Sequence, residues 1–242
     1  MEDKRKYHII IGSKGYFDMN LPEFTEDDVV DDFLELVKIS DTAKQNRLML
    51  DQHADILTIK NNSYHGIVEA AHDRLGPLIE ELTTDDAEIY IHNPPSVLKE
   101  YLENQKERSL IELDIVSEKY EIKRDSDVFV NKIKEISLHI FGQQTAIEEI
   151  SKSLWYLTTV KRSKPYVIML YGNSSLGKTE LVREIAEKFF GGKYLEKHLS
   201  MFKNNNYSEY FFGDAPNRRS LGYDLLERES NLIFFDELDK CP

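Results

Sequence analysis

One stretch of this sequence constrains its fold more than any other, because an apolar run, a glycine-containing loop and a helical pattern follow one another directly. The run is 166–171, YVIMLY, and the loop is 172–179, GNSSLGKT. From residue 180 to 190, apolar side chains then recur at helical spacing. An unbroken apolar run favours a strand buried on both faces of a parallel sheet. Strand, loop and helix in this order predict an α/β fold.

The loop has the G-x-x-x-x-G-K-[ST] pattern of a phosphate-binding loop, or Walker A motif. Its backbone N–H groups can turn inward to form an anion-binding nest, and the helix that follows adds the positive end of its dipole. Lys178 would contact the β- and γ-phosphates, and the Thr179 hydroxyl would coordinate Mg²⁺. We therefore predict nucleotide binding by Gly172, Asn173, Ser174, Ser175, Leu176, Gly177, Lys178, Thr179 and Glu180.

A second apolar run, 231–235, ends in the adjacent acids Asp236 and Glu237, and Asp236 follows Thr179 by 57 residues. In such a Walker B strand the first acid holds Mg²⁺ and the second polarises the attacking water. Asp236 is thus predicted to share the metal with Thr179, and Glu237 is the predicted catalytic base. The paired acids favour an ATPase over a GTPase. The guanine-reading Asn-Lys-x-Asp pattern has only a near match, at 131–134, which lacks the final Asp.

Two further segments complete a family pattern. Residues 140–147 read IFGQQTAI, and residues 236–240 read DELDK. Together with the phosphate loop, they resemble the AAA+ ATPases and, within them, the Clp chaperone and unfoldase clade. The resemblance covers about 128–242 and implies a P-loop NTPase core with a parallel sheet, and ATP and Mg²⁺ as cofactors. It also implies that Ile140, Gly142 and Gln143 line the adenine pocket.

The same resemblance implies a ring of identical subunits that remodels or unfolds a protein substrate. Residues 211–213, FFG, match either the pore loop that grips substrate or the turn before it. The family module continues past the Walker B strand with a sensor strand, an arginine finger and a lid, so the module is expected to be incomplete here. In the family the sensor strand separates runs 166–171 and 231–235, which are therefore not expected to pair. For this chain alone we expect no ATP turnover above background.

Two other functions stay open at this stage. The first is a regulatory or defence P-loop ATPase whose nucleotide state controls assembly or signalling. The second is a non-catalytic fragment that binds nucleotide only. Loss of substrate structure on ATP addition would distinguish remodelling from the first alternative, and measured turnover would distinguish an enzyme from the second.

Charge divides the chain into two parts. Residues 1–120 hold 26 acids and 13 Lys or Arg, whereas residues 121–242 hold 18 of each. This step predicts a separate acidic α+β domain at 1–125, which would recognise a substrate or partner, before an ATP-binding core at 126–242. An acidic domain argues against binding to nucleic acid or to an anionic membrane, since both need clustered Lys and Arg.

Within the acidic domain, strands are expected at 7–11, 87–92 and 111–115. Helices are expected at 25–38, capped by Thr25, at 65–82, and at 96–105, capped by Ser96. The seven histidines form no metal-ligand pattern, and His65 and His72 are interpreted as surface residues of one helix. Cys241 is the single cysteine. With no signal peptide or membrane-length run in the sequence, a reducing, cytoplasmic location is expected.

Overall fold

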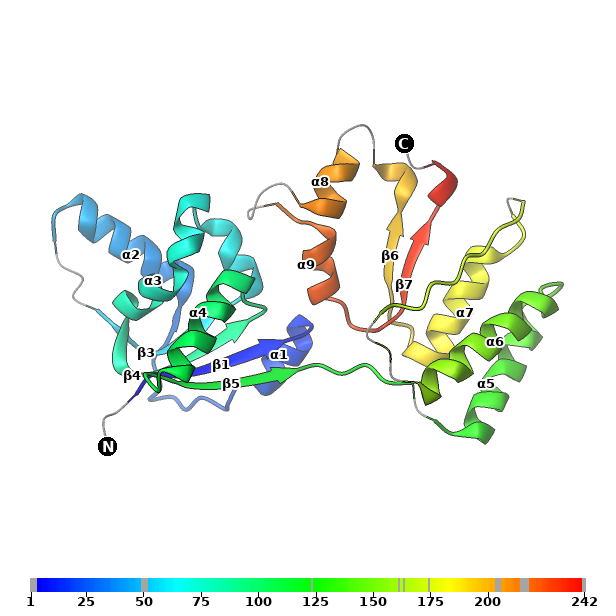
Figure 1. Ribbon diagram of the computed structural model, residues 1–242, viewed down its shortest axis with the longest axis horizontal. Coiled ribbons are helices and arrows are strands. Elements are labelled where there is room, and N and C mark those ends of the chain that lie inside the picture. Colours follow the sequence, from blue (N-terminus) through cyan, green and yellow to red (C-terminus); the bar gives the residue numbers. More distant parts are fainter. Residues whose placement is uncertain are drawn as a thin grey trace. The chain divides into compact units, whose positions relative to one another are not determined.

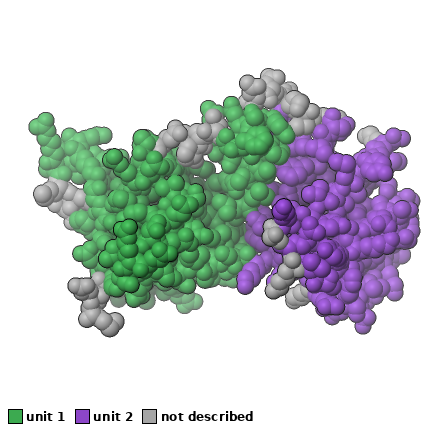
Figure 2. Space-filling view, in the orientation of Figure 1, with its two compact units in different colours: residues 1–118, 205–227 green, residues 119–204, 228–242 purple. Residues whose placement is uncertain are grey.

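The computed structural model separates the chain into two compact units (Figure 1). Unit 1 contains Met1–Glu118 and Asn205–Glu227, and unit 2 contains Lys119–Asn204 and Arg228–Pro242 (Figure 2). The two domains predicted at 1–125 and 126–242 have other boundaries than these units, and they remain a prediction. The residues that the structure describes are 4–48, 52–122, 124–160, 162, 164–173, 175–202, 206–213 and 218–240.

Unit 1 is built on a five-stranded sheet in which all pairs are parallel, in the order β2-β3-β4-β1-β5. In the central strand β1, Tyr7 lies opposite Ile89 of β4 on one side and Leu113 of β5 on the other. Three of these strands confirm the strands predicted at 7–11, 87–92 and 111–115. The strands are β1 Lys6–Ile11, β2 Val30–Asp32, β3 Ala54–Ile59, β4 Thr83–His92 and β5 Glu112–Ser117.

Helices cover both faces of this sheet (Figure 1). Tyr7 and Ile9 project to the face that packs against α2 (Phe33–Gln45), α3 (Leu75–Leu82) and α4 (Ser96–Glu107). Ile10 projects to the other face, where it packs with Phe17 of α1 (Lys14–Asn20). An all-parallel sheet with helices on both faces is α/β, so the predicted α+β arrangement of this domain is wrong.

The helix boundaries in unit 1 also correct the sequence analysis. α2 begins at Phe33, because the Asp32 carboxylate accepts a hydrogen bond from the Leu34 N–H and caps the helix there. Thr25 instead hydrogen-bonds Asp28 through its N–H and its hydroxyl, at 2.7 and 2.8 Å, in a turn.

Of the helix predicted at 65–82, only Leu75–Leu82 is α-helical. The residues before it form two 3₁₀ segments, η1 (Asn61–Gly66) and η2 (Glu69–Arg74). α4 matches the third predicted helix, but its N-cap residue is Pro95, and no side chain caps it. The predicted cap by Ser96 is therefore wrong.

Unit 1 is completed by a segment from the second half of the chain. It holds α8 (Asn206–Phe212) and α9 (Leu221–Leu226), which Ser220 caps by accepting from the Tyr223 N–H. Asn61, just after β3, donates a 2.6 Å hydrogen bond to the Glu227 carboxylate, and this bond ties the segment to the carboxyl end of the sheet.

Unit 2 packs three helices around one apolar core. This core joins α5 (Ser126–His139), α6 (Gln144–Thr159) and α7 (Lys178–Phe190). α7 confirms the helix predicted after the phosphate loop, and it ends at Gly191 in the left-handed conformation, with φ of 63°. The principal core side chains are Phe129, Ile136, Ile147, Ile150, Leu154, Leu181 and Ile185.

A two-stranded parallel sheet completes unit 2. β6 (Leu195–His198) pairs with β7 (Ile233–Asp236), and each is followed by a 3₁₀ turn, η3 (Leu199–Met201) and η4 (Leu238–Lys240). β7 confirms the strand predicted before the two acids, although its side chains are half-buried rather than fully buried.

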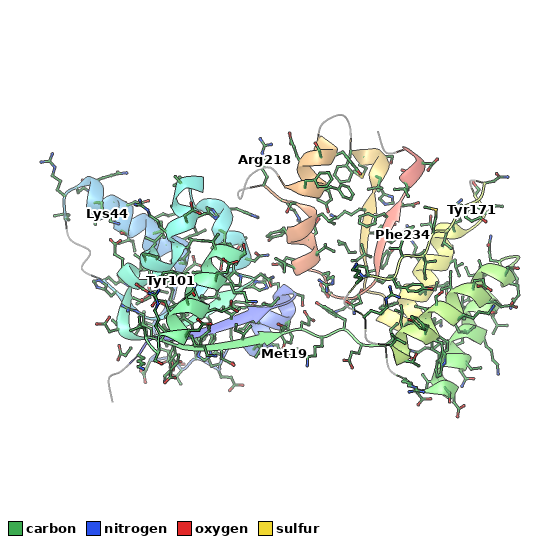
Figure 3. All side chains as sticks on the ribbon, viewed as in Figure 1. Met19, Lys44, Tyr101, Tyr171, Arg218 and Phe234 are labelled. Atoms are coloured by element: carbon green, nitrogen blue, oxygen red, sulfur yellow. The ribbon has the colours of Figure 1, made fainter. Side chains whose placement is uncertain are left out.

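The buried strand predicted at 166–171 is wrong. This segment is irregular and pairs with no strand among the described residues. Val167 is 84% exposed and Tyr171, labelled in Figure 3, is 91% exposed. A strand requires a neighbour that takes its backbone hydrogen bonds, and in the described part of unit 2 β6 and β7 pair with each other. Residues 166–171 thus have the apolar pattern of a buried strand, but no strand among the described residues pairs with them.

Candidate functional site

The predicted phosphate loop leads directly into α7, whose first residue is Lys178. The backbone has positive φ at Gly172 (146°), Ser175 (63°) and Gly177 (81°). Residues with positive φ turn successive N–H groups toward one side of a loop, which produces an anion-binding concavity. Ser174, also predicted to bind nucleotide, lies outside the described residues.

The Lys178 ammonium group lies against the loop. It donates to the carbonyl oxygens of Gly172 at 3.0 Å and Asn173 at 2.8 Å. These acceptors are neutral, and an ammonium group bonds more strongly to an anionic oxygen. The lysine is therefore held beside the loop in a place where a phosphate could take over its hydrogen bonds.

Thr179 and Asp236 are brought together from opposite ends of the predicted site. The Thr179 hydroxyl donates to Asp236 Oδ2 at 3.2 Å, across 57 residues of sequence. The other carboxylate oxygen of Asp236 accepts from the Glu237 N–H at 2.8 Å. Hydroxyl and carboxylate oxygens are hard ligands of the kind that Mg²⁺ prefers. These two residues fit a metal ion beside the phosphate loop.

Glu237, the predicted base, follows β7 directly. Its φ of 57° is in the left-handed region, which is uncommon for a residue other than glycine. Its carboxylate accepts a hydrogen bond from the Ser200 hydroxyl of η3. Ser200 is thus a member of the site that the sequence did not indicate, because it becomes a neighbour of Glu237 only through the pairing of β6 with β7.

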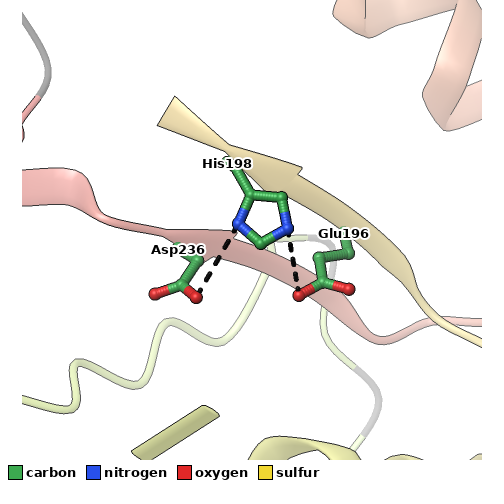
Figure 4. A group of neighbouring side chains, drawn as sticks. All are labelled: Glu196, His198 and Asp236. Carbon is green, nitrogen blue, oxygen red and sulfur yellow. Dashed lines mark ion pairs between the residues drawn. The ribbon is translucent and has the colours of Figure 1, made fainter. Parts of the chain in front are cut away.

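A second unpredicted group lies on the same sheet. The imidazole of His198 lies between two carboxylates, with Nδ1 3.8 Å from Asp236 Oδ2 and Nε2 3.5 Å from Glu196 Oε1 (Figure 4). The strand register places His198 directly opposite Asp236. One ligand atom from each of the three residues lies within 4.8 Å of the others, so this group could also hold a divalent cation. The sequence feature that could have indicated this group is the spacing of Glu196 and His198, which places both side chains on one face of a strand.

The residues predicted to line the adenine pocket do not all lie at the phosphate loop, because one of them packs in the core of unit 2. Gln143 donates through Nε2 to the Leu176 carbonyl, so the turn before α6 contacts the phosphate loop. Gly142 has a φ of 74° and supplies the sharp turn there. Ile140 is 8% exposed and packs in the core of α5, α6 and α7. Glu180 lies in the first turn of α7, where its charge complements the helix dipole.

Comparison with known proteins gives one match. The family model described as "ATPase family associated with various cellular activities (AAA)" matches residues 168–242. The matched part contains the phosphate loop and both acids, and it supports an AAA-family ATPase that binds ATP through a P-loop. Neither the curated proteins nor the solved structures gave a match. In the part of the chain that the structure describes, no helix has the length and apolar character to cross a membrane.

The α/β class is confirmed, but the five-stranded parallel sheet lies in unit 1, before the matched residues. The matched residues contain both strands of the two-stranded parallel sheet, β6 and β7.

Proposed function

We propose that this chain binds ATP with Mg²⁺ at residues 172–179 and hydrolyses it as part of a complete assembly. The observation that carries the proposal is the hydrogen bond between Thr179 and Asp236, which joins the phosphate loop to the end of β7. That contact supports the assignment of Thr179 and Asp236 as metal residues. The AAA match over the same residues supports ATP as the nucleotide.

Each residue has a distinct role in this proposal. The loop N–H groups and Lys178 hold the β- and γ-phosphates, and Thr179 and Asp236 hold the metal. Bound Mg²⁺ would neutralise charge on the transferred phosphoryl group. The Glu237 carboxylate accepts a proton from the attacking water, and the hydrogen bond from Ser200 holds that carboxylate in place.

The finer proposal is protein remodelling of the Clp type by a ring of identical subunits. It is supported by the segments at 140–147 and 236–240 and by the AAA match. Phe211 and Phe212 end α8, and the Phe212 side chain is 85% exposed, as expected for a group that grips a substrate. In a complete assembly, replacing both phenylalanines with alanine should abolish threading while ATP binding is kept. Unchanged threading would exclude the pore-loop role.

A nucleotide-controlled regulatory or defence ATPase is the alternative, and ATP-driven loss of substrate structure separates the two. Binding without hydrolysis is the third reading, in which Lys178 and the loop act without turnover by Glu237.

ATP binding is tested by titrating the chain with a fluorescent ATP analogue, with and without Mg²⁺. Lys178→Ala should weaken binding by about ten- to a hundred-fold, because it removes a charge-assisted hydrogen bond worth about 1.5–3 kcal/mol. Lys188→Ala is the matched control on the same helix, since that ammonium pairs with Glu135 and not with the loop. Equal affinities of the two variants would contradict the proposal.

The metal and base roles need separate measurements. Asp236→Asn should remove the dependence of binding on Mg²⁺ and leave metal-free binding nearly unchanged. Glu237→Gln should bind ATP normally, and any phosphate release measured for the unmodified chain should disappear in it. Phosphate release that persists in Glu237→Gln would remove this residue from the catalytic role.

A further inference from the structure

Unit 1 contains a cavity that the proposed ATP site does not use. Its volume is about 550 Å³, within the range of small-molecule sites. It is lined by the residues that follow β3 and β4 and by the segment that holds α9. All of the residues that line it belong to unit 1.

The cavity lies where the topology of the sheet favours ligand binding. β1 and β4 are neighbouring parallel strands, yet the helices that follow them cover opposite faces of the sheet. The chain therefore leaves the carboxyl ends of these two strands in opposite directions, and open α/β sheets bind their ligands at such points. The cavity lies beside this point, because its lining residues follow β3 and β4, and Asn93 among them bonds Gly12, which follows β1.

Asn93, which lines the cavity, is held in place by a network of buried hydrogen bonds. The Asn93 side chain accepts from the Gly12 N–H at 3.0 Å and donates to the Gly12 carbonyl at 2.9 Å, and both residues follow their strands directly. His92 Nε2 lies 2.9 Å from the same carbonyl oxygen, and its ring stacks on Phe17 at 4.7 Å. Asn93 and His92 are each 2% exposed. A lining side chain that is fixed by buried hydrogen bonds favours a preorganised site.

The walls suit a planar ring. His65 and Tyr223 place their rings 4.9 Å apart on the lining, one from η1 and one from α9. Tyr64 also lines the cavity, and its hydroxyl is buried without a hydrogen-bond partner among the described residues. Buried hydroxyl groups are normally satisfied, so this one indicates a missing polar partner.

One end of the cavity suits an anion. Ser96 and Val97, the first residues of α4, line it, and their N–H groups lie at the positive end of a twelve-residue helix. Arg218 also lines the cavity and brings a positive charge to it, and its guanidinium pairs with Glu209 at 3.1 Å. The carboxylate among the described lining residues, Asp73, is exposed.

We propose that this cavity binds a small anion that carries a planar ring, of the size and chemistry of a nucleoside monophosphate. The ring lies against His65 and Tyr223, and the anionic group lies at the start of α4 near Arg218. This site is separate from the phosphate loop at 172–179, and its ligand contacts unit 1 alone.

The experiment uses the full chain carrying Lys178→Ala, which weakens the phosphate loop. Calorimetry with each of the common nucleoside monophosphates should show saturable binding for at least one of them. Adding Ser96→Glu should weaken that binding about ten-fold or more, because a carboxylate then faces the ligand anion. The same change places an acid in the first turn of α4, where it stabilises the helix, so lost binding would not reflect lost structure.

Two more variants complete the test. Tyr223→Leu should weaken binding by removing a ring, whereas Asn104→Asp, which puts the same charge on the exposed last turn of α4, should not. Absence of binding by every nucleoside monophosphate, or equal binding to the Ser96→Glu variant, would overturn the proposal. Equally tight binding of inorganic phosphate would refute the role of the ring, and equally tight binding of the nucleoside would refute the role of the anion. Because the phosphate loop is weakened in every sample, these outcomes are independent of the proposed ATP site.

Discussion

Replacing Gly76 with alanine is expected to destabilise unit 1, because the ring of Tyr101 occupies the space of the new methyl group. Gly76 is a buried residue of α3, and Tyr101 belongs to α4 (Figure 3). A Cβ atom at Gly76 would lie 2.3 Å from Cδ1, 2.4 Å from Cε1 and 2.8 Å from Cγ of that ring. The ring cannot move freely, since its hydroxyl donates to Glu80 at 2.7 Å and accepts from Gln105 at 2.8 Å.

Two opposing effects set the magnitude. Overpacking of a well-packed interior costs about 1–3 kcal/mol, and contacts this short belong in the upper half of that range. Alanine is favoured over glycine inside a helix by about 1 kcal/mol. The Gly76→Ala variant should therefore lose about 1–2 kcal/mol of the free energy of unfolding of unit 1.

Gly15→Ala is the matched control and should have the opposite sign. Gly15 is an exposed residue of α1, and nothing lies within 4 Å of the position its Cβ would take. With no contact to disturb, the substitution restricts the unfolded chain and should stabilise by about 0.4–1 kcal/mol.

The assay is amide hydrogen exchange measured by mass spectrometry, which reports peptides of α3 and α4 separately from the rest of the chain. Trp155, the single tryptophan, lies in unit 2, so its fluorescence during urea unfolding gives an internal reference. Exchange in α3 that is as slow in Gly76→Ala as in the unmodified chain would refute the packing argument. So would equal acceleration in Gly15→Ala.

Three further outcomes are expected. Asn93→Ala should destabilise unit 1 by about 2–4 kcal/mol, because it leaves the buried Gly12 N–H without its partner and puts alanine at a φ of 46°; urea unfolding followed by circular dichroism measures this. Asp224→Ala should speed hydrogen exchange in α8 and α9, since the buried Asp224 carboxylate accepts from Arg219 at 2.5 Å and hydrogen bonds to a charged group contribute about 1.5–3 kcal/mol. Burial, with the hydrogen bond to Glu88, raises the pKa of Tyr90 from 10.0 to about 12. Folding thus favours the neutral phenol of Tyr90. Its contribution to the free energy of unfolding should be complete below pH 10 and lost as the pH rises toward 12. Tyrosinate absorbance recorded along an alkaline titration should then show Tyr90 ionising later than exposed tyrosines, and ionisation near pH 10 would contradict this.

Periodic apolar residues in the sequence correctly predicted those strands and helices whose packing depends on the same apolar residues. The central strand at 7–11 and the helix after the phosphate loop were predicted because their apolar residues, at strand or helical spacing, face a core. The helix expected from Thr25 was wrong because Asp32 competes as a cap and the residues between them form a turn and strand β2. Capping residues are common in the sequence, and the helix that forms is the one whose Phe33 and Leu36 pack in the core.

The strand predicted at 166–171 was wrong for a non-local reason, since an apolar run becomes a strand only beside another strand. The candidate site was predicted where a motif fixes the spacing, as with Thr179 and Asp236. Ser200 and His198 were not predicted, because their proximity to the acids depends on the register of β6 against β7. The cavity in unit 1 draws on segments far apart in sequence and has no motif of its own.

The route of the chain limits how this protein can be divided experimentally. The chain leaves unit 1 after Glu118, returns for residues 205–227 and leaves again, so the units are joined by three covalent crossings. A single proteolytic cut near residue 119 would leave residues 1–118 held to the rest of the chain only by noncovalent contacts within unit 1, such as the hydrogen bond between Asn61 and Glu227. A gene fragment ending there would lack α9 and its hydrogen bond to Asn61, and the complementary fragment would carry α9 without its partner. Dissection should instead keep the chain whole and use point substitutions in one unit at a time.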